Sequence, residues 1–348
     1  MPPEVSVLMS VYNGSLYLRE AVESILNQTF RDCEFIILDD GSTDSTWDIL
    51  ADYAQRDQRI VLLRNEKNIS LTKSLNRGLQ RVRGKYIARQ DGDDVSLPER
   101  LATQIAYLRS HADVGLLGTA YYIADCQGRY AGIYRPPQTD TEIRWKMLFH
   151  NAFCHTSVVF RRELFEAGDA FYNEDLLYSQ DYDLWTQLIR RTCAANLPTP
   201  LVAFRMHESS IAVMRSEEQQ RIATAIAARQ IDTLMPQPPL SEQEVNTLRV
   251  WYKTFPKRLN HQDVALCLVL FQILGEFKKQ KNLDPDVLRR LRRHWIGRIL
   301  GALPISRQKD LWRSGLLAAM LREDALSVLL QVPKQAIHRI VLFIQRNG

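Results

Sequence analysis

The 348-residue sequence predicts an α/β fold, with a doubly wound, mostly parallel central sheet, helices on both of its faces and a helical C-terminal region. Three observations lead to this prediction. Short apolar runs alternate with segments of helical periodicity over residues 5–123. The apolar runs are continuous, which is typical of parallel strands covered on both faces. From about residue 242 onward the pattern is helical.

The elements of the alternating part follow one another in order. The strand-like runs are residues 5–11, 34–38, 60–64, 85–89 and 114–123. The helix-like segments are residues 16–27, a segment ending at 53, residues 71–82 and a segment ending at 108. Ser96 is the predicted N-cap of the last of these helices, with Pro98 in its first turn and Glu99 three residues after the cap.

Beyond residue 123 the pattern is mixed. It predicts a helix over residues 141–149, a strand over 154–162, a helix that starts near 178–185 and ends at 191, and a strand over 200–207. A helical tail follows, broken by prolines at 236, 238 and 239. We therefore expect two domains, residues 1–215 and residues 216–348.

Charge divides the chain in the same way. The net charge is +5, but from Val250 onward there are 18 Lys and Arg against 7 Asp and Glu, so the preceding part is acidic. A basic tail suggests an anionic partner such as a membrane surface or nucleic acid.

The remaining composition excludes several classes of protein. Five scattered cysteines without a CxxC pair fit reduced thiols and argue against a disulfide framework or a zinc site. The N-terminus lacks the basic region of a signal peptide, and no apolar stretch reaches the ~18 residues of a spanning helix. We expect a cytoplasmic protein.

An acidic turn follows the strand over residues 85–89. It contains Asp91, Asp93 and Asp94, with Gly92 between the first two. Carboxylates at the carboxyl end of a strand offer hard oxygen ligands to Mg²⁺ or Mn²⁺, which would in turn bind phosphate. The alternative is a surface turn that caps the next helix.

Other polar turns lie at the same end of the predicted sheet. Tyr12 and Asn13 follow the first strand, and Asp39 and Asp40 follow the second. Ligands of open α/β sheets bind beyond the carboxyl ends of the strands, so this convergence favours a site. Neither GxGxxG nor GxxxxGK[ST] is present, which argues against a dinucleotide-binding fold and a P-loop.

Seven motifs occur in an order and spacing that resemble a known family. They are VSVLMSVYNG, EFIILDDGSTD, NISLTKSLNRG, KYIARQDGDD, HTSVVFRR, SQDYDLW and FRMH. Together, over roughly residues 4–215, the chain looks like a family 2 glycosyltransferase of the GT-A fold, of the bacterial polysaccharide or O-antigen type. The resemblance implies a nucleotide-sugar donor and inversion at the anomeric carbon.

The resemblance assigns the nucleoside to the first two turns. Ser10, Tyr12 and Asn13 would hold it, with Tyr12 beside the base, and Asp40 would read uracil. A carboxylate can accept the imide N–H of uracil, so the chemistry fits. Alternatively, Asp39 and Asp40 only form an Asx-turn that caps the next helix.

A further donor-binding segment is implied around Asn68 and Asn76. These residues match the family's N…N-x-G pattern. Ser70 stands where a glycine is common, which makes the local backbone path an open question.

The acidic turn matches the family's DXD motif as Asp91-Gly92-Asp93. Asp93 is the implied direct ligand of Mg²⁺ or Mn²⁺, and the cation would bridge the donor diphosphate. Asp94 would bind sugar hydroxyls or cap the following helix. His207 is either a further metal ligand or a structural histidine.

Asp181 falls where the family places the catalytic base that takes the proton of the acceptor hydroxyl. Gln180 replaces the glutamate that the family often has before it. The alternative makes Asp181 or Asp183 the N-cap of the next helix.

Four other residues have two interpretations each. His155 lies on the acceptor side of the pocket or contributes to packing. Arg205 and Arg215 bind diphosphate or are solvated. Trp185 is interpreted as a core residue and not as a platform for sugar.

The basic tail also has two interpretations. Over residues 283–303, arginines are interleaved with Trp295 and aliphatic residues, and a second apolar stretch covers residues 337–344. Such a helix can lie in a membrane interface. It can equally be the solvated face of a helical subdomain or an oligomer interface.

The sequence thus predicts an inverting, metal-dependent transferase that moves a sugar from a UDP-sugar to a hydroxyl of a glycan or lipid-linked glycan. Its catalytic domain is residues 1–215, and peripheral contact with the inner face of the plasma membrane is a hypothesis for residues 216–348. One rival, a sugar-nucleotide nucleotidyltransferase, needs a Gly-rich loop that VYNGSLYL lacks. The other, a non-catalytic anion-binding protein, leaves the acidic crevice unexplained and would repel phosphates there, so no nucleic acid is expected.

Overall fold

The computed structural model describes residues 2–166, 171–207, 217–235, 239–302 and 315–321. The chain divides into two compact units, Met1–Ile226 and Ala227–Gly348. The first unit contains the sheet and every predicted site residue. The described part of the second unit is helical.

Within the described residues, one nine-stranded sheet has the order β3-β2-β1-β4-β8-β6-β9-β5, with β7 paired to β6. Neighbours among β1 to β4 pair in parallel, and so do β6 and β9. The short strands β5, β7 and β8 run against their neighbours, so the sheet is less parallel than the alternation suggests. The strands are β1 (Val5–Val11), β2 (Cys33–Asp39), β3 (Ile60–Arg64), β4 (Tyr86–Arg89), β5 (Val95–Ser96), β6 (Val114–Ala124), β7 (Tyr130–Tyr134), β8 (Val159–Arg161) and β9 (Cys193–Arg205).

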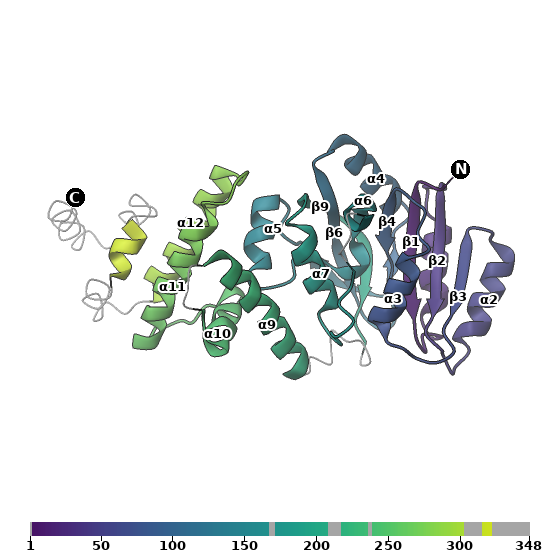
Figure 1. Cartoon of the computed structure of the whole chain (residues 1–348), viewed down its shortest axis with the longest axis horizontal. Coiled ribbons are helices and arrows are strands. Elements are labelled where there is room, and N and C mark those ends of the chain that lie inside the picture. Colours follow the sequence, from purple (N-terminus) through teal and green to yellow (C-terminus); the bar gives the residue numbers. More distant parts are fainter. Residues whose placement is uncertain (1, 167–170, 208–216, 236–238, 303–314, 322–348) are drawn as a thin grey trace. The chain divides into compact units, whose positions relative to one another are not determined.

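Figure 1 shows β3, β2 and β1 side by side with α2 next to β3. The helices of the first unit are α1 (Leu18–Leu26), α2 (Thr46–Arg56), α3 (Leu71–Leu79), α4 (Arg100–Ser110), α5 (Asp140–Met147), α6 (Glu163–Glu166) and α7 (Gln180–Leu188), and a 3₁₀ turn, η1, covers His155–Ser157. Helix α9 (Glu217–Leu234) extends across the boundary between the units.

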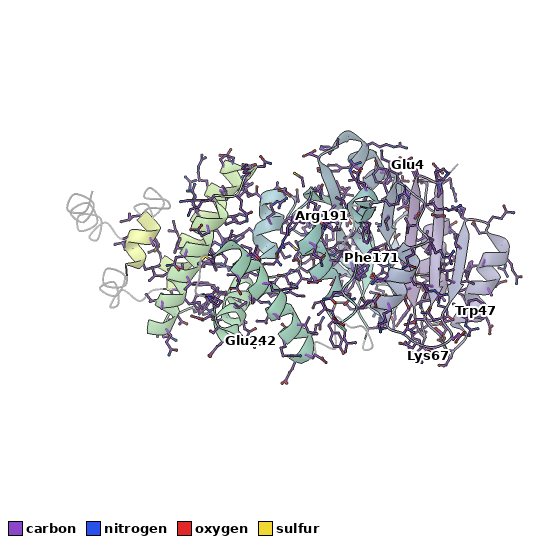
Figure 2. All side chains as sticks on the ribbon, in the orientation of Figure 1. Glu4, Trp47, Lys67, Phe171, Arg191 and Glu242 are labelled. Carbon is purple, nitrogen blue, oxygen red and sulfur yellow. The ribbon has the colours of Figure 1, made fainter. Side chains whose placement is uncertain are left out.

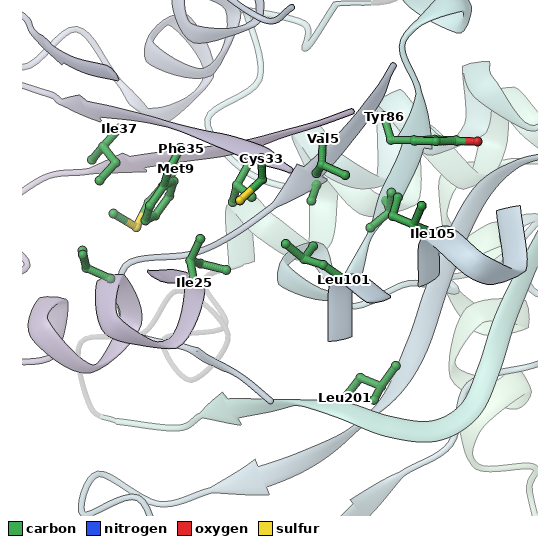
Figure 3. Packing of buried hydrophobic residues seen from close by; sticks show 14 of the residues in the cluster. Val5, Met9, Ile25, Cys33, Phe35, Ile37, Tyr86, Leu101, Ile105 and Leu201 are labelled. Atoms are coloured by element: carbon green, nitrogen blue, oxygen red, sulfur yellow. The ribbon is translucent and has the colours of Figure 1, made fainter. Parts of the chain in front are cut away.

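Helices cover both faces of the sheet, as the sequence predicts. Alternate residues of β1 point to opposite sides: Val5 and Met9 pack with α1, α2 and α4, whereas Leu8 packs with α3, α5 and α7. Figure 3 shows the first of these two cores, with Ile25 of α1 and Leu101 of α4 beside strand residues. All seven residues of β1 and of β2 are buried, which explains their continuous apolar pattern.

The carboxyl ends of β1 to β4, β6 and β9 all lie at one end of the sheet. Glu4 precedes β1 and Lys67 follows β3, and the two lie at opposite ends of the strands in Figure 2. The turns after β1, β2 and β4 therefore share the edge near Lys67.

Two predicted elements are wrong in part. Residues 154–162 were expected to form one strand, but they begin with η1 and only Val159–Arg161 pairs in the sheet. Cys154 and Ser157 explain the difference, because the carbonyl of Cys154 accepts from both the amide and the hydroxyl of Ser157 and so closes a turn. The strand predicted over residues 200–207 instead starts at Cys193.

The second unit contains α10 (Glu242–Lys253), α11 (His261–Phe277) and α12 (Pro285–Ala302). Trp295, Ile296 and Ile299 of α12 are at most 2% exposed, and Trp295 lies against Tyr252 and Phe255. The apolar face of this basic helix is thus covered by protein. No helix in the described residues combines the length and apolar character needed to cross a bilayer, and residues 337–344 lie outside the described part.

Candidate active site

A buried glutamine, Gln90, holds the acidic turn after β4 by hydrogen bonds. Gln90 donates from Nε2 to the carbonyl oxygens of Asp91 (3.0 Å) and Asp94 (2.8 Å). Ser96 donates from its hydroxyl to Gln90 Oε1 at 2.6 Å. Ser96 is therefore not the N-cap that we predicted: it belongs to β5, and the cap position of α4 is Glu99.

Two buried guanidinium groups lie beneath the turn. Arg89 and Arg100 are both fully buried. Arg100 donates to the carbonyl of Arg89 (2.8 Å) and to Ser96 Oγ (2.8 Å), and burial lowers its pKa to about 10. The positive charges of Arg89 and Arg100 partly offset the negative charges of the aspartates in the acidic turn.

Asp91 has partners on both carboxylate oxygens. Oδ1 accepts from Arg89 Nη2 at 2.6 Å, and Oδ2 lies 3.4 Å from His155 Nδ1. Although burial opposes ionisation, the contact with His155 and the charge of Arg89 hold the pKa of Asp91 well below its usual range. Asp91 is a fixed anion.

Asp93 is paired with the histidine that the resemblance proposed as a metal ligand. Asp93 Oδ2 lies 2.9 Å from His207 Nε2, and the His207 ring is tilted against that of Tyr17, with a centroid distance of 4.9 Å. Burial raises the pKa of Asp93, the charge of Asp91 raises it further, and His207 opposes both.

Asp93 offers a carboxylate oxygen, the ligand type that Mg²⁺ and Mn²⁺ prefer, and His207 beside it offers an imidazole nitrogen, which is a more usual ligand of softer ions. Two adjacent ligands of an octahedral ion, each about 2.1 Å from it, are about 3.0 Å apart, close to the separation found here. No group of three His, Cys, Asp or Glu side chains in metal-binding arrangement occurs in the part of the chain that the structure describes. A hexacoordinate cation would thus take most of its ligands from phosphate and water, as Mg²⁺ usually does.

Arg205 is neither solvated nor free to bind diphosphate, so both predictions for it are wrong. It is 3% exposed, its Nε donates to the Asp93 carbonyl (2.9 Å), and its Nη2 donates to Glu20 Oε2 (2.5 Å). Its backbone amide donates to Asp94 Oδ1 at 2.8 Å. Arg205 and Tyr17, whose ring lies 4.6 Å away, fasten β9 to the acidic turn. Arg215 lies outside the described residues.

Asp94 is a buried side chain and does not cap α4. It is 1% exposed, and burial together with the charges of Asp93 and Asp91 raises the pKa of Asp94 well above its usual range. Asp94 therefore joins the turn to β9 through the amide of Arg205.

The turns after β1 and β2 are tied together. Asn13 donates from its amide to Ser42 Oγ (2.9 Å), and its Oδ1 accepts from the amide of Thr43 (2.8 Å). Tyr12 is 47% exposed at this edge, and Ser10 is buried in β1. The exposed ring of Tyr12 is available to stack on a planar group.

Asp40 lies in the same edge and orders the segment after β3. Its Oδ1 accepts from Asn65 Nδ2 (2.7 Å) and from the amide of Ile69 (2.9 Å). Asp39 forms the Asx-turn, because its Oδ1 accepts from the amide of Ser42 at 3.1 Å. The two aspartates have separate roles.

The departure at Ser70 has a structural explanation. Ser70 has φ +89°, in the region that favours glycine. Asn68 Oδ1 accepts from its amide at 3.1 Å. The backbone therefore follows the path that a glycine would give.

Asp181 occupies the first turn of α7. Its Oδ1 accepts from the amide of Tyr182 and its Oδ2 from Asn151 Nδ2, both at 2.7 Å. Burial raises the pKa of Asp181, His155 lowers it and Asp91 raises it, so the acidic turn lies within electrostatic range. The N-cap position of α7 is Ser179, so a capping role for Asp181 or Asp183 is wrong.

Trp185 is fully buried, which confirms its interpretation as a core residue. Three residues of the site, Asn151, Arg89 and Tyr172, are not predicted from the sequence. Arg89 had a signal, since a charge at the end of an apolar strand is unusual. Asn151 and Tyr172 had none.

Comparisons with known proteins identify the family. The family model for Glycosyl transferase family 2 matches residues 6–168. An uncharacterized glycosyltransferase of Haemophilus influenzae is 32% identical over 237 residues, covering 66% of this chain and 73% of that protein. The chain belongs to glycosyltransferase family 2. The amylovoran biosynthesis glycosyltransferase AmsE of Erwinia amylovora is 34% identical over 203 residues, covering 58% of this glycosyltransferase and 75% of AmsE.

Solved structures confirm the predicted GT-A fold of this family 2 glycosyltransferase. S. aureus TarS in complex with UDP-GlcNAc superposes with a TM-score of 0.55 at 16% identity, covering 93% of this chain and 91% of that one. The mannosyltransferase PcManGT from Pyrobaculum calidifontis, in complex with GDP-Man and Mn²⁺, gives 0.52 at 16% identity, covering 94% and 88%.

Proposed function

We propose that this enzyme is an inverting, metal-dependent glycosyltransferase that moves a sugar from a UDP-sugar to a hydroxyl of a glycan or lipid-linked glycan in cell-surface polysaccharide synthesis. Its kinship with AmsE, named for amylovoran biosynthesis, supports the pathway class. The fold it shares with TarS, solved with UDP-GlcNAc, supports the donor class.

The donor would bind at the carboxyl ends of the parallel strands. Tyr12 would stack on the base, and Asp40 would accept the imide N–H of uracil, with Ser10, Asn13 and Asn68 lining the same edge. A carboxylate at this position requires a base with an N–H donor, such as the imide of uracil.

Asp93 and His207 would hold Mg²⁺ or Mn²⁺, with Asp91 as the second carboxylate of the motif. When bound, the cation supplies positive charge to the donor diphosphate. The structure of PcManGT in complex with GDP-Man and Mn²⁺ supports this role. Without a cation, Asp91 and Asp93 would repel the diphosphate.

Asp181 would act as the base. The acceptor oxygen forms a bond to the anomeric carbon while the bond from that carbon to the diphosphate oxygen breaks. The acceptor proton passes to Asp181, and the nucleoside diphosphate leaves. Attack from the face opposite the leaving group inverts the anomeric centre.

A single observation supports this proposal most directly: His155 Nδ1 lies 3.4 Å from Asp91 Oδ2, and the His155 ring lies 6.2 Å from that of Trp185, which belongs to α7, the helix that carries Asp181 in its first turn. The test is release of nucleoside diphosphate from UDP-, GDP- and dTDP-sugars with and without Mn²⁺. We expect Mn²⁺-dependent cleavage of a UDP-sugar. Formation of UTP from a UDP-sugar and pyrophosphate would instead indicate a nucleotidyltransferase.

A peripheral membrane contact through the basic C-terminal region remains part of the proposal, and it is electrostatic only. The apolar face of α12 is buried, whereas Arg289 and Arg293 are exposed. Flotation with anionic vesicles at low and high salt is the test. We expect binding that high salt abolishes, and failure to float at low salt would end the idea.

A further inference from the structure

His155 lies at the centre of a buried polar cluster. Its Nε2 is 2.9 Å from Arg89 Nε and 2.9 Å from the hydroxyl of Tyr172. Because the guanidinium can only donate, Nε2 accepts, and the ring proton belongs on Nδ1. The His155 side chain is 13% exposed, so water competes little for these contacts.

The ring proton faces the first aspartate of the acidic turn. His155 Nδ1 lies 3.4 Å from Asp91 Oδ2, and Arg89 Nη2 donates to Asp91 Oδ1 at 2.6 Å. Arg89, His155 and Asp91 thus form a closed ring of contacts. This ring fixes the orientation of the carboxylate.

Tyr172 extends the ring to the loop that leads to Asp181. Asn76 of α3 donates to the Tyr172 carbonyl (2.8 Å) and accepts from its amide (3.0 Å), so the Tyr172 backbone is held from two sides. The rings of Tyr172 and His155 both lie beside Trp185 of α7, at 6.4 and 6.2 Å. One cluster therefore contacts both the acidic turn and the helix of the proposed base.

We propose that His155 is a positioning residue for donor binding: through Nδ1 it holds Asp91 in the orientation that the donor diphosphate and its cation require, and through Tyr172 it ties that orientation to the loop before α7. This inference rests on the proposed function and deepens it. His155 touches neither sugar nor phosphate and acts through Asp91.

Two substitutions distinguish the role of the Nδ1 atom of His155 from that of its Nε2 atom. His155→Asn keeps an N–H near the Nδ1 position and removes the acceptor at Nε2, whereas His155→Gln keeps a polar atom near Nε2 and removes the donor to Asp91. The probe is UDP with Mn²⁺, measured by calorimetry. We expect the dissociation constant of UDP to rise about tenfold or more in His155→Gln and His155→Ala, and about threefold or less in His155→Asn.

Tyr172→Phe removes one oxygen and keeps the packing, so on its own it tests the cluster without any substitution at His155. We expect weaker UDP binding in the wild-type background and no added loss in His155→Gln. His111 and Tyr107 provide the matched control, because they form a histidine–tyrosine pair at the C-terminal end of α4, stacked at 3.9 Å, with His111 exposed. His111→Gln and Tyr107→Phe should leave UDP binding unchanged.

Equal UDP affinity in His155→Asn and His155→Gln would overturn the inference. A wild-type chain that binds no UDP would contradict the proposed function instead, and a second measurement then tests the contact. In ¹⁵N-histidine spectra the His155 signal, identified by its loss in His155→Gln, should show the proton on Nδ1. A proton on Nε2 would overturn the inference without any donor.

Discussion

Opposing influences act on the carboxylate of Asp181. Burial favours its protonated form, while the amide of Tyr182 and the side chain of Asn151 donate to the charged form. A raised pKa makes a carboxylate a stronger base, and the two hydrogen-bond donors fix the orientation of this carboxylate. These are the properties that proton removal from a hydroxyl requires.

Replacing this carboxylate should remove most of the activity. Asp181→Asn keeps the shape and loses the basic oxygen, so we expect a fall in the transfer rate of about 10²- to 10⁴-fold with UDP binding unchanged. Asp175→Asn, an exposed aspartate in the loop before α7, is the control. Wild-type turnover in Asp181→Asn would refute the role of base.

The pH dependence of transfer should report the same group. Asp181 must be ionised to accept a proton, so activity falls as the pH drops through its pKa, which lies above that of an ordinary aspartate. Asn151→Ala removes a donor that favours the charged form, so the acid limb of kcat should move to higher pH. A limb that stays in place or moves to lower pH would contradict this assignment.

The second aspartate of the acidic turn should control the metal response. Asp93→Asn removes the negative charge beside His207, so we expect loss of Mn²⁺ binding. The measurement is the electron paramagnetic resonance signal of free Mn²⁺ in a titration of the protein. The control is Asp125→Asn, a half-buried aspartate paired with Arg129 and not part of the acidic turn. Undiminished Mn²⁺ binding in Asp93→Asn would locate the cation elsewhere.

At the scale of single residues, the sequence could predict the candidate site only in part. The polar turns at the carboxyl edge were evident because strand order and turn chemistry are local signals. The role of Asn151 was not evident, because it depends on a contact with Asp181, 30 positions away. The role of Tyr172 was not evident either, because its contacts are with Asn76, 96 positions away, and with His155, 17 positions away. Arg205 was misjudged because its burial depends on the pairing of β9 with β6.

Among the elements, the turn after β2 depends on one glycine. Gly41 has φ +71°, and a Cβ there would lie 2.5 Å from the backbone carbon of Lys67. We expect Gly41→Ala to lower the free energy of unfolding by about 2 kcal/mol or more, measured by urea denaturation, and to weaken UDP binding. Gly132→Ala in β7, where a Cβ meets nothing within 4 Å, should be nearly neutral. Equal effects of the two substitutions would contradict this explanation.

Element boundaries show where local patterns fail. β1 and β3 match their predicted ranges because continuous apolar runs end at polar turns. The predicted cap at Ser96 failed because its hydroxyl serves Gln90 and Arg100, a tertiary demand that the capping pattern does not reveal. Strand β5 has only two residues, too few to form a pattern.

For the molecule as a whole, the division into two units makes a prediction. Trp295 is 2% exposed in the second unit, and Trp295→Ala should destabilise that unit by about 3–5 kcal/mol. Because every candidate site residue lies in Met1–Ile226, UDP binding at low temperature should persist. Val250→Ala, at a side chain 53% exposed, is the control for stability. Loss of UDP binding together with the second unit would show that the site depends on it.

The internal arginines have a consequence for the cation-free protein. Arg89 pairs with Asp91, and the guanidinium groups of Arg100 and Arg205 lie close to the turn, so part of the repulsion between its aspartates is offset without an ion. We therefore expect chelation of the divalent cation to abolish sugar transfer while leaving the melting temperature of the protein almost unchanged. On the proposed function the ion would arrive with the nucleotide, and exchange of Mg²⁺ for Mn²⁺ would need no refolding.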